Sequence, residues 1–206
     1  ANLNEIFNAP CEENIDTSTD RINFSHLPTL EILNEVPVKF PAREITAVVS
    51  ASADDRTNLT NALFRFVDAS NETILIDGHK IKDIRICELR NKIGLVTQDS
   101  SLFDGTVMDN ILYGSENKER GDAMNAARLA GAHNFIENLP GGYDACVGHC
   151  GELLSKGEQK LIAIARVILR NPPIIIFDES NEQLDAECEF HIYKTRKYRY
   201  TGRKTN

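Results

Sequence analysis

Residues 154–179 read LSKGEQKLIAIARVILRNPPIIIFDE, and this segment narrows the fold class more than any other part of the chain. Ser155 and Glu158 have the spacing of a capping box, in which the serine accepts a hydrogen bond from an early helical N–H and the glutamate reaches back. The apolar residues that follow recur at helical spacing, at Leu161, Ile162, Ala165, Ile168 and Leu169. The segment therefore predicts an amphipathic helix that ends before Asn171-Pro172-Pro173.

A strand follows this helix and ends in two adjacent carboxylates. The four consecutive apolar residues 174–177 are typical of a strand buried on both faces, and Asp178 and Glu179 come directly after them. A rigid buried strand can hold one carboxylate beside a metal-bound phosphate and the next beside an attacking water. The same pattern also fits a strand that simply emerges into a polar turn, so these residues alone leave both interpretations open.

Strands alternate with helices through the rest of the chain, and this order predicts a mostly parallel α/β core. Leu59, Leu63 and Phe66 recur at helical spacing. From about residue 101 to 153 the pattern is largely helical, notably at 120–130 and 133–138, which predicts a helical insertion. The segment 45–49 is apolar enough for a strand buried on both faces. Other strands are predicted at residues 21–25, 30–33, 37–40, 73–76 and 93–96.

Composition limits the protein class. A chain of 206 residues, 41% of them hydrophobic, suits one domain with room for a core, here residues 21–206 after a polar lead-in at 1–20. No stretch approaches the roughly 18 apolar residues of a membrane-spanning helix, and the first residues do not have the pattern of a secretory signal. The odd, scattered cysteines predict reduced thiols in an intracellular protein; they are Cys11, Cys87, Cys146, Cys150 and Cys188.

The charge is distributed unevenly. The formal net charge is −8, yet the tail at residues 194–206 holds six basic residues and no acidic one. An acidic body does not suit a nucleic-acid groove, so this tail is the one part that could bind a polyanion such as RNA, or a large assembly. Tyr193, Tyr198 and Tyr200 could stack on bases there. A short basic end that is merely solvated is the simpler alternative.

These motifs together resemble the nucleotide-binding domains of ABC transporters, most of all exporter half-transporters of the mitochondrial Atm type. The likeness runs from about residue 23 to residue 187. It implies a P-loop NTPase-like fold with a mostly parallel sheet, an N-terminal antiparallel β-subdomain and a helical insertion at about 101–153. It also implies that the protein is located at a mitochondrial or mitosome-like membrane, on the matrix or cytosolic side. The segments that carry it include 154–158, 162–166, 171–173, 176–179, 63–66, 76–78, 98–99, 102–103, 110–111, 113–114, 139–140 and 142–144.

The resemblance assigns roles to five residues. Asp178 resembles the Walker B carboxylate that orients the Mg²⁺ shell, and Glu179 resembles the base that polarises the attacking water. Gln98 resembles the Q-loop residue that links the metal site to the membrane domain. Ser155 and Gly157 resemble the signature that caps the γ-phosphate bound to the opposite subunit, although Lys156 stands where the family has glycine.

The resemblance fails at the phosphate-binding loop, which falls at residues 50–58. The family has three glycines and an invariant lysine there, because the backbone must take positive φ and bring N–H groups close to the phosphates. This chain has Ser50, Ala53 and Asp55 at the glycine positions and Arg56 at the lysine position. Arg56 keeps the positive charge, but its planar fork is a poor substitute for a compact ammonium.

The acidic pair Asp54-Asp55 weighs further against nucleotide binding. At an effective dielectric near 20, a carboxylate about 4 Å from a phosphate costs on the order of 4 kcal/mol. Thr57 could still offer a hydroxyl to Mg²⁺, and Asp178 and Gln98 are the other predicted ligands of the ion. His26 falls at the position where the family stacks the adenine base on an aromatic residue. The sequence therefore predicts no ATP at the chain's own site; alternatively the aspartates rotate outward and weak binding of ATP and Mg²⁺ survives.

The leading hypothesis is a degenerate ABC-type domain of an exporter-like protein, inactive at its own loop. It would act as a structural or regulatory partner of an ABC-type subunit or transmembrane domain. One alternative is a working transporter ATPase truncated in this chain, since the family continues into a strand that ends at a switch histidine and no histidine here is so placed. The other alternative is an interaction protein that uses the basic tail.

Cys146, His149 and Cys150 are close enough in sequence to suggest a metal site. Two thiols and one imidazole lack a fourth ligand, however, so the pattern does not favour such a site.

Overall fold

The structure is a computed structural model that describes residues 30–33, 38–42, 44, 46–48, 53–66, 73–97 and 99–178. The chain forms two compact units, Ala1–Gly94 and Leu95–Asn206. The first holds β1 (Leu30–Leu33), β2 (Val38–Phe40), α2 (Ala53–Leu63), β3 (Thr73–Ile76), β4 (His79–Lys80), η1 (Ile81–Asp83) and α3 (Ile86–Lys92). From β5 (Ile93–Thr97) onward come α4 (Val107–Leu112), α5 (Arg120–Ala130), α6 (His133–Asn138), η2 (Gly142–Asp144), η3 (His149–Gly151), α7 (Lys156–Arg170) and β6 (Ile174–Asp178).

The first unit contains a four-stranded sheet with the order β2-β1-β3-β4, in which neighbouring strands are antiparallel. Leu30 pairs with Ile76 and Ile32 with Ile74, so every second residue faces the same side. These four side chains are buried. The predicted N-terminal antiparallel β-subdomain is therefore confirmed, whereas the predicted strand at 21–25 lies outside the described residues.

The strand predicted at residues 45–49 is wrong over the part that the structure describes. Thr46, Ala47 and Val48 form no strand and are exposed, Val48 by 47%. An apolar, β-branched run becomes a strand only when neighbouring strands satisfy its backbone groups. None of the strands in the described ranges pairs with this segment.

Helix α2 starts earlier than the sequence pattern indicated. It begins at Ala53, inside the segment interpreted as a loop through residue 58, and it ends at Leu63, before Phe66. No glycine occurs between residues 50 and 58 to interrupt a helix. Aspartates are also favoured in a first helical turn, where they complement the positive end of the helix dipole.

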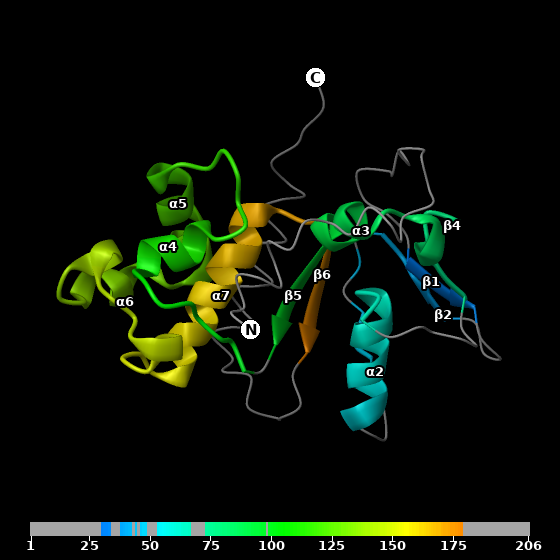
Figure 1. Cartoon of the computed structure of the whole chain (residues 1–206), viewed down its shortest axis with the longest axis horizontal. Helices are drawn as coiled ribbons and strands as arrows, with labels where there is room; N and C mark the ends of the chain where they lie inside the picture. Colours follow the sequence, from blue (N-terminus) through cyan, green and yellow to red (C-terminus); the bar gives the residue numbers. More distant parts are fainter. Residues whose placement is uncertain are drawn as a thin grey trace. The chain divides into compact units, whose positions relative to one another are not determined.

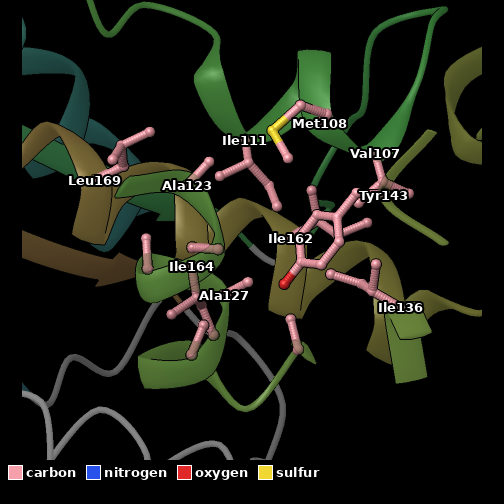
Figure 2. Close-up of a cluster of buried hydrophobic side chains, with 14 of the residues drawn as sticks. Val107, Met108, Ile111, Ala123, Ala127, Ile136, Tyr143, Ile162, Ile164 and Leu169 are labelled. Carbon is pink, nitrogen blue, oxygen red and sulfur yellow. The ribbon is translucent and has the colours of Figure 1, made fainter. Parts of the chain in front are cut away.

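The second unit is built around α7, which packs against α5 and α4 (Figure 2). Ile162 of α7 and Ile111 of α4 are fully buried, as are the alanines Ala123 and Ala127 of α5. Alanines at this interface let two helices approach closely, so that the larger side chains of α7 fill the space between them. The helices predicted at 120–130 and 133–138 are confirmed as α5 and α6.

Helix α7 ends where the sequence predicts. Asn171 takes the left-handed conformation (φ 57°) and its N–H donates to the carbonyls of Val167 and Ile168 at 3.1 and 3.2 Å. After Pro172-Pro173 the chain enters β6, which pairs with β5 so that both arrows run the same way (Figure 1). The α/β class with one antiparallel and one parallel sheet is thus confirmed.

Two further observations concern the whole described chain. Every helix in the described ranges is too short or too polar to cross a membrane. Cys146 and Cys150 are free, but Cys87 is disulfide-bonded, so the expectation of five reduced thiols is wrong at that position.

The burial of α7 gives a first prediction. Ile162→Ala should lower the free energy of unfolding by about 2–5 kcal/mol, because it leaves a cavity between α7 and its neighbours. Urea unfolding followed by circular dichroism measures the change. Leu153→Ala is the control, since Leu153 is 66% exposed; a loss no larger than that of this control would contradict the assignment of the core.

Candidate functional site

The first turn of α7 carries the serine that the sequence singled out. Ser155 is the N-cap, and its Oγ accepts from the Glu158 N–H at 3.3 Å. Glu158 Oε2 accepts in return from the Ser155 N–H and from the Ser155 hydroxyl, both at 2.8 Å. The predicted capping box is confirmed. Both side chains lie at an exposed helix start, where the unpaired N–H groups and the dipole attract anions.

Gly157 follows in the same turn, and the fold does not need a glycine there. Its φ is not positive, and a Cβ built on it would meet no atom within 4 Å. A glycine at an exposed helical position is less favourable than alanine by about 1 kcal/mol. The open space over Gly157 therefore leaves the backbone of this turn accessible to a ligand or to another protein chain.

A buried glutamine fixes the loop in front of this turn. Gln159 Nε2 donates to the carbonyls of Gly151 and Leu154 at 2.8 and 3.0 Å. Gly151 has φ +84°, and a Cβ there would stand 3.2 Å from both Gln159 and Leu102. The chain that leads into Ser155 is thus held by hydrogen bonds and close packing.

An arginine network holds the other end of α7. Arg166 Nε donates to the Asn110 carbonyl at 2.8 Å, and a second guanidinium N–H donates to Asn110 Oδ1 at 2.9 Å. The guanidinium also stacks over the rings of Phe103 and Tyr113. Burial lowers the pKa of Arg166 to about 10, with the charge of Tyr113 acting in the opposite direction. The arginine therefore stays charged at neutral pH and ties α7 to α4.

The carboxylate predicted from the strand pattern lies at the end of β6. Asp178 is half-buried and is the last residue of that strand, and its neighbour β5 ends at Thr97. Gln98, Glu179 and His26 fall outside the described residues. The assigned roles of these three residues remain predictions.

The residues of the phosphate-loop segment lie on α2 in the other unit. Thr57 is an exposed residue of this helix. Arg56 also belongs to α2, so its backbone is helical. The roles predicted for Arg56 and Thr57 in the ATP site, and for Thr57, Asp178 and Gln98 at Mg²⁺, are not tested by this geometry.

A possible metal-binding group forms near η3, but its members differ from the three residues that the sequence spacing indicated. Asp104, His149 and Cys150 hold donor atoms within 4.8 Å of one another, whereas Cys146 is not part of this group. Asp104 lies 45 residues from His149 along the chain. No local spacing could have indicated this carboxylate; only the fold brings it to the two neighbours.

Comparison with known proteins gives consistent results. A sequence profile described as ABC transporter matches residues 33–182. The ATP-dependent lipid A-core flippase of Syntrophus aciditrophicus (strain SB) is 42% identical over 184 residues, 89% of this chain and 30% of that protein. A putative multidrug export ATP-binding/permease protein of Staphylococcus aureus (strain NCTC 8325 / PS 47) is 40% identical over 191 residues, 90% of this chain and 33% of that protein.

A solved structure is also similar. It is a bacterial Atm1-family ABC exporter with ATP bound, which matches with a TM-score of 0.80 and 34% identity over 91% of this chain and 35% of its own. The chain thus spans about a third of the length of the curated relatives it matches.

The capping box gives the second prediction. Ser155→Ala should lower the free energy of unfolding by about 1 kcal/mol, because the Glu158 N–H loses its acceptor. Ser155→Asn, which keeps an N-cap acceptor, should unfold close to the wild-type urea midpoint. Equal midpoints for the alanine and asparagine variants would show that the serine does not cap α7.

Proposed function

Because this chain belongs to the ABC transporter family, we propose that it is an ATP-binding cassette domain without nucleotide binding at its own phosphate loop. In this proposal it serves an exporter-like protein as the structural or regulatory partner of an intact subunit. The resemblance drawn from the motifs, including the Atm-type likeness, agrees with these matches. The mitochondrial or mitosome-like location remains a prediction from the sequence.

The first support is the backbone of residues 53–58. All six residues belong to α2. Only Thr57 and Asn58 of these six have a carbonyl four residues back within the helix to which their N–H groups donate, whereas the N–H groups of the first turn, residues 53–56, have no such partner. A cradle of several convergent amides needs the glycine conformations that Ser50, Ala53 and Asp55 disfavour.

The second support is electrostatic. Asp54 and Asp55 add two negative charges to a segment that would have to hold a polyphosphate, and Arg56 supplies one positive charge. Each close carboxylate–phosphate contact costs on the order of 4 kcal/mol at an effective dielectric near 20. One arginine does not offset both aspartates.

The metal chemistry by itself fits the residues. Asp178 and Thr57 offer a carboxylate and a hydroxyl, which are the hard oxygen donors that Mg²⁺ prefers. Bound Mg²⁺ would neutralise phosphate charge, and by resemblance to the family Glu179 would polarise the attacking water and Gln98 would link the metal site to the membrane domain. Loss of the phosphate cradle rather than of these donors is therefore the proposed cause of inactivity.

The observation that carries the partner role is the open first turn of α7. Ser155 is exposed and Gly157 has free space above it, although the helix would be more stable with alanine. The first-turn amides at this helix N-terminus suit the γ-phosphate of ATP held by another subunit, and the Ser155 hydroxyl would join them by leaving Glu158 Oε2, to which it donates in this structure. We therefore assign to this turn the completion of a partner's ATP site.

The third prediction tests the loop. Calorimetric titration of the wild-type chain with Mg·ATP should give no saturable binding below about 1 mM, which corresponds to less than roughly 4 kcal/mol of binding free energy. A repaired chain with Ser50→Gly, Ala53→Gly, Asp55→Gly and Arg56→Lys should bind more tightly by at least about tenfold. Micromolar binding by the wild-type chain would instead favour a working ATPase.

The fourth prediction tests the partner role with two matched glycines. Gly157 and Gly121 are each the second residue of a helix with a capping box, and a Cβ on either meets nothing within 4 Å. The repaired chain, carrying Ser155→Arg to disable its own signature, should associate with the wild-type chain in Mg·ATP, as measured by sedimentation. Gly157→Ala in the wild-type chain should weaken this association by at least about tenfold, while Gly121→Ala should not.

This comparison separates folding from recognition, because both alanines should stabilise their helices by similar small amounts. Equal effects of the two substitutions on association would contradict a role for the α7 turn. Absence of any ATP-dependent association, once the repaired chain is shown to bind ATP, would contradict the partner role itself.

A further inference from the structure

Three exposed side chains converge where η3 meets the segment before α4. His149 Nε2 lies 3.7 Å from Cys150 Sγ, and His149 Nδ1 lies 3.3 Å from Asp104 Oδ2. The donor atoms of all three residues fall within 4.8 Å of one another. A thiol, an imidazole and a carboxylate thus share one small volume of accessible surface.

The backbone around this group is tied together before any ligand is present. The segments of Asp104 and Cys150 are joined by a bridge between Thr106 and Cys146, and by a hydrogen bond from the Val147 N–H to the Gly105 carbonyl at 3.0 Å. The Cys150 N–H also donates to Asp104 Oδ1 at 3.1 Å. The three residues are therefore brought together by the fold rather than by chance contacts of long side chains.

The donor types point to a particular class of ligand. In a tetrahedral zinc site the metal–sulfur and metal–nitrogen bonds are about 2.3 and 2.0 Å long. The sulfur and nitrogen ligands of one such ion are therefore roughly 3.5 Å apart, close to the distance between His149 Nε2 and Cys150 Sγ. Thiolate and imidazole select Zn²⁺ and its neighbours, whereas Ca²⁺ and Mg²⁺ prefer oxygen. Asp104 Oδ2 lies against the other imidazole nitrogen, Nδ1, so the ring or the carboxylate has to turn before all three donors bind one ion.

We propose that Asp104, His149 and Cys150 form a binding site for a thiophilic divalent cation of the Zn²⁺ class, with water in the remaining position. Binding replaces the thiol proton by the metal–sulfur bond and releases that proton to solvent. The site needs neither nucleotide nor a second chain, so it stands independently of the proposed ATP-related function.

The sequence offers a matched control within the same loop. Cys146 is also free and exposed, and it lies four positions before Cys150, but its sulfur is not part of the donor group. A non-specific affinity of surface thiols for metal would depend on both cysteines. A specific metal site would depend on Cys150 and not on Cys146.

The fifth prediction uses Co²⁺ as a spectroscopic probe for Zn²⁺. Titration of the full chain, with the Cys87 disulfide intact and Cys150 as a free thiol, should produce tetrahedral Co²⁺ bands and a thiolate-to-Co²⁺ charge-transfer band. The bands should saturate at about one ion per chain and disappear when Zn²⁺ is added. Cys150→Ser and His149→Gln should abolish the charge-transfer band or weaken Co²⁺ affinity by at least about tenfold. Asp104→Asn should weaken the affinity by roughly 10–100-fold.

Cys146→Ser should leave the spectrum and the affinity unchanged, and Mg²⁺ in excess should not compete. All four positions are exposed, so circular dichroism of each variant should match the wild type. Bands that persist in Cys150→Ser, or that fall equally in Cys146→Ser, would overturn the site and indicate adventitious thiol binding only.

Discussion

Burial of the apolar face of α7 against α4 and α5 is the interaction on which both described parts of the candidate site depend. This packing fixes the helix whose first turn presents Ser155 and Gly157 and whose last turn leads through Pro172 into β6 and Asp178. Arg166 strengthens the arrangement, because its buried guanidinium donates to two oxygens of Asn110. Removing it would take a donor from the Asn110 carbonyl and leave Asn110 Oδ1 with the Phe103 N–H. A single buried helix face thus positions the signature turn at one end and the strand carboxylate at the other.

The two segments that resemble parts of a nucleotide site differ in the backbone that they offer to a phosphate. The α7 turn keeps a glycine that costs the helix stability and that no neighbouring atom requires. The α2 segment has lost glycines that a phosphate cradle requires, and its backbone is helical from Ala53. The proposed role, a cap for another subunit's phosphate in a domain without a phosphate cradle of its own, accounts for both observations.

Features that depend on nearby residues were predictable from sequence, and features that depend on distant partners were not. The capping box, the ends of α5 and α6 and the strand β3 follow from local spacing and turn chemistry, and the structure has them as predicted. The strand expected at 45–49 failed because pairing is non-local, and the start of α2 was misplaced because the family's glycine pattern was applied to a sequence without glycines. Asp104 joins His149 through the fold, which no spacing in the sequence encodes.

Hydrogen–deuterium exchange of the wild-type chain can show whether α2 or α7 meets the nucleotide, since it reports on the first turns of both helices in one experiment. The account predicts that Mg·ATP alone changes exchange at neither turn. Adding the ATP-loaded repaired chain with Ser155→Arg should slow exchange at the first turn of α7 and leave α2 unchanged. Slower exchange at Ala53–Leu63 with Mg·ATP alone would contradict the account.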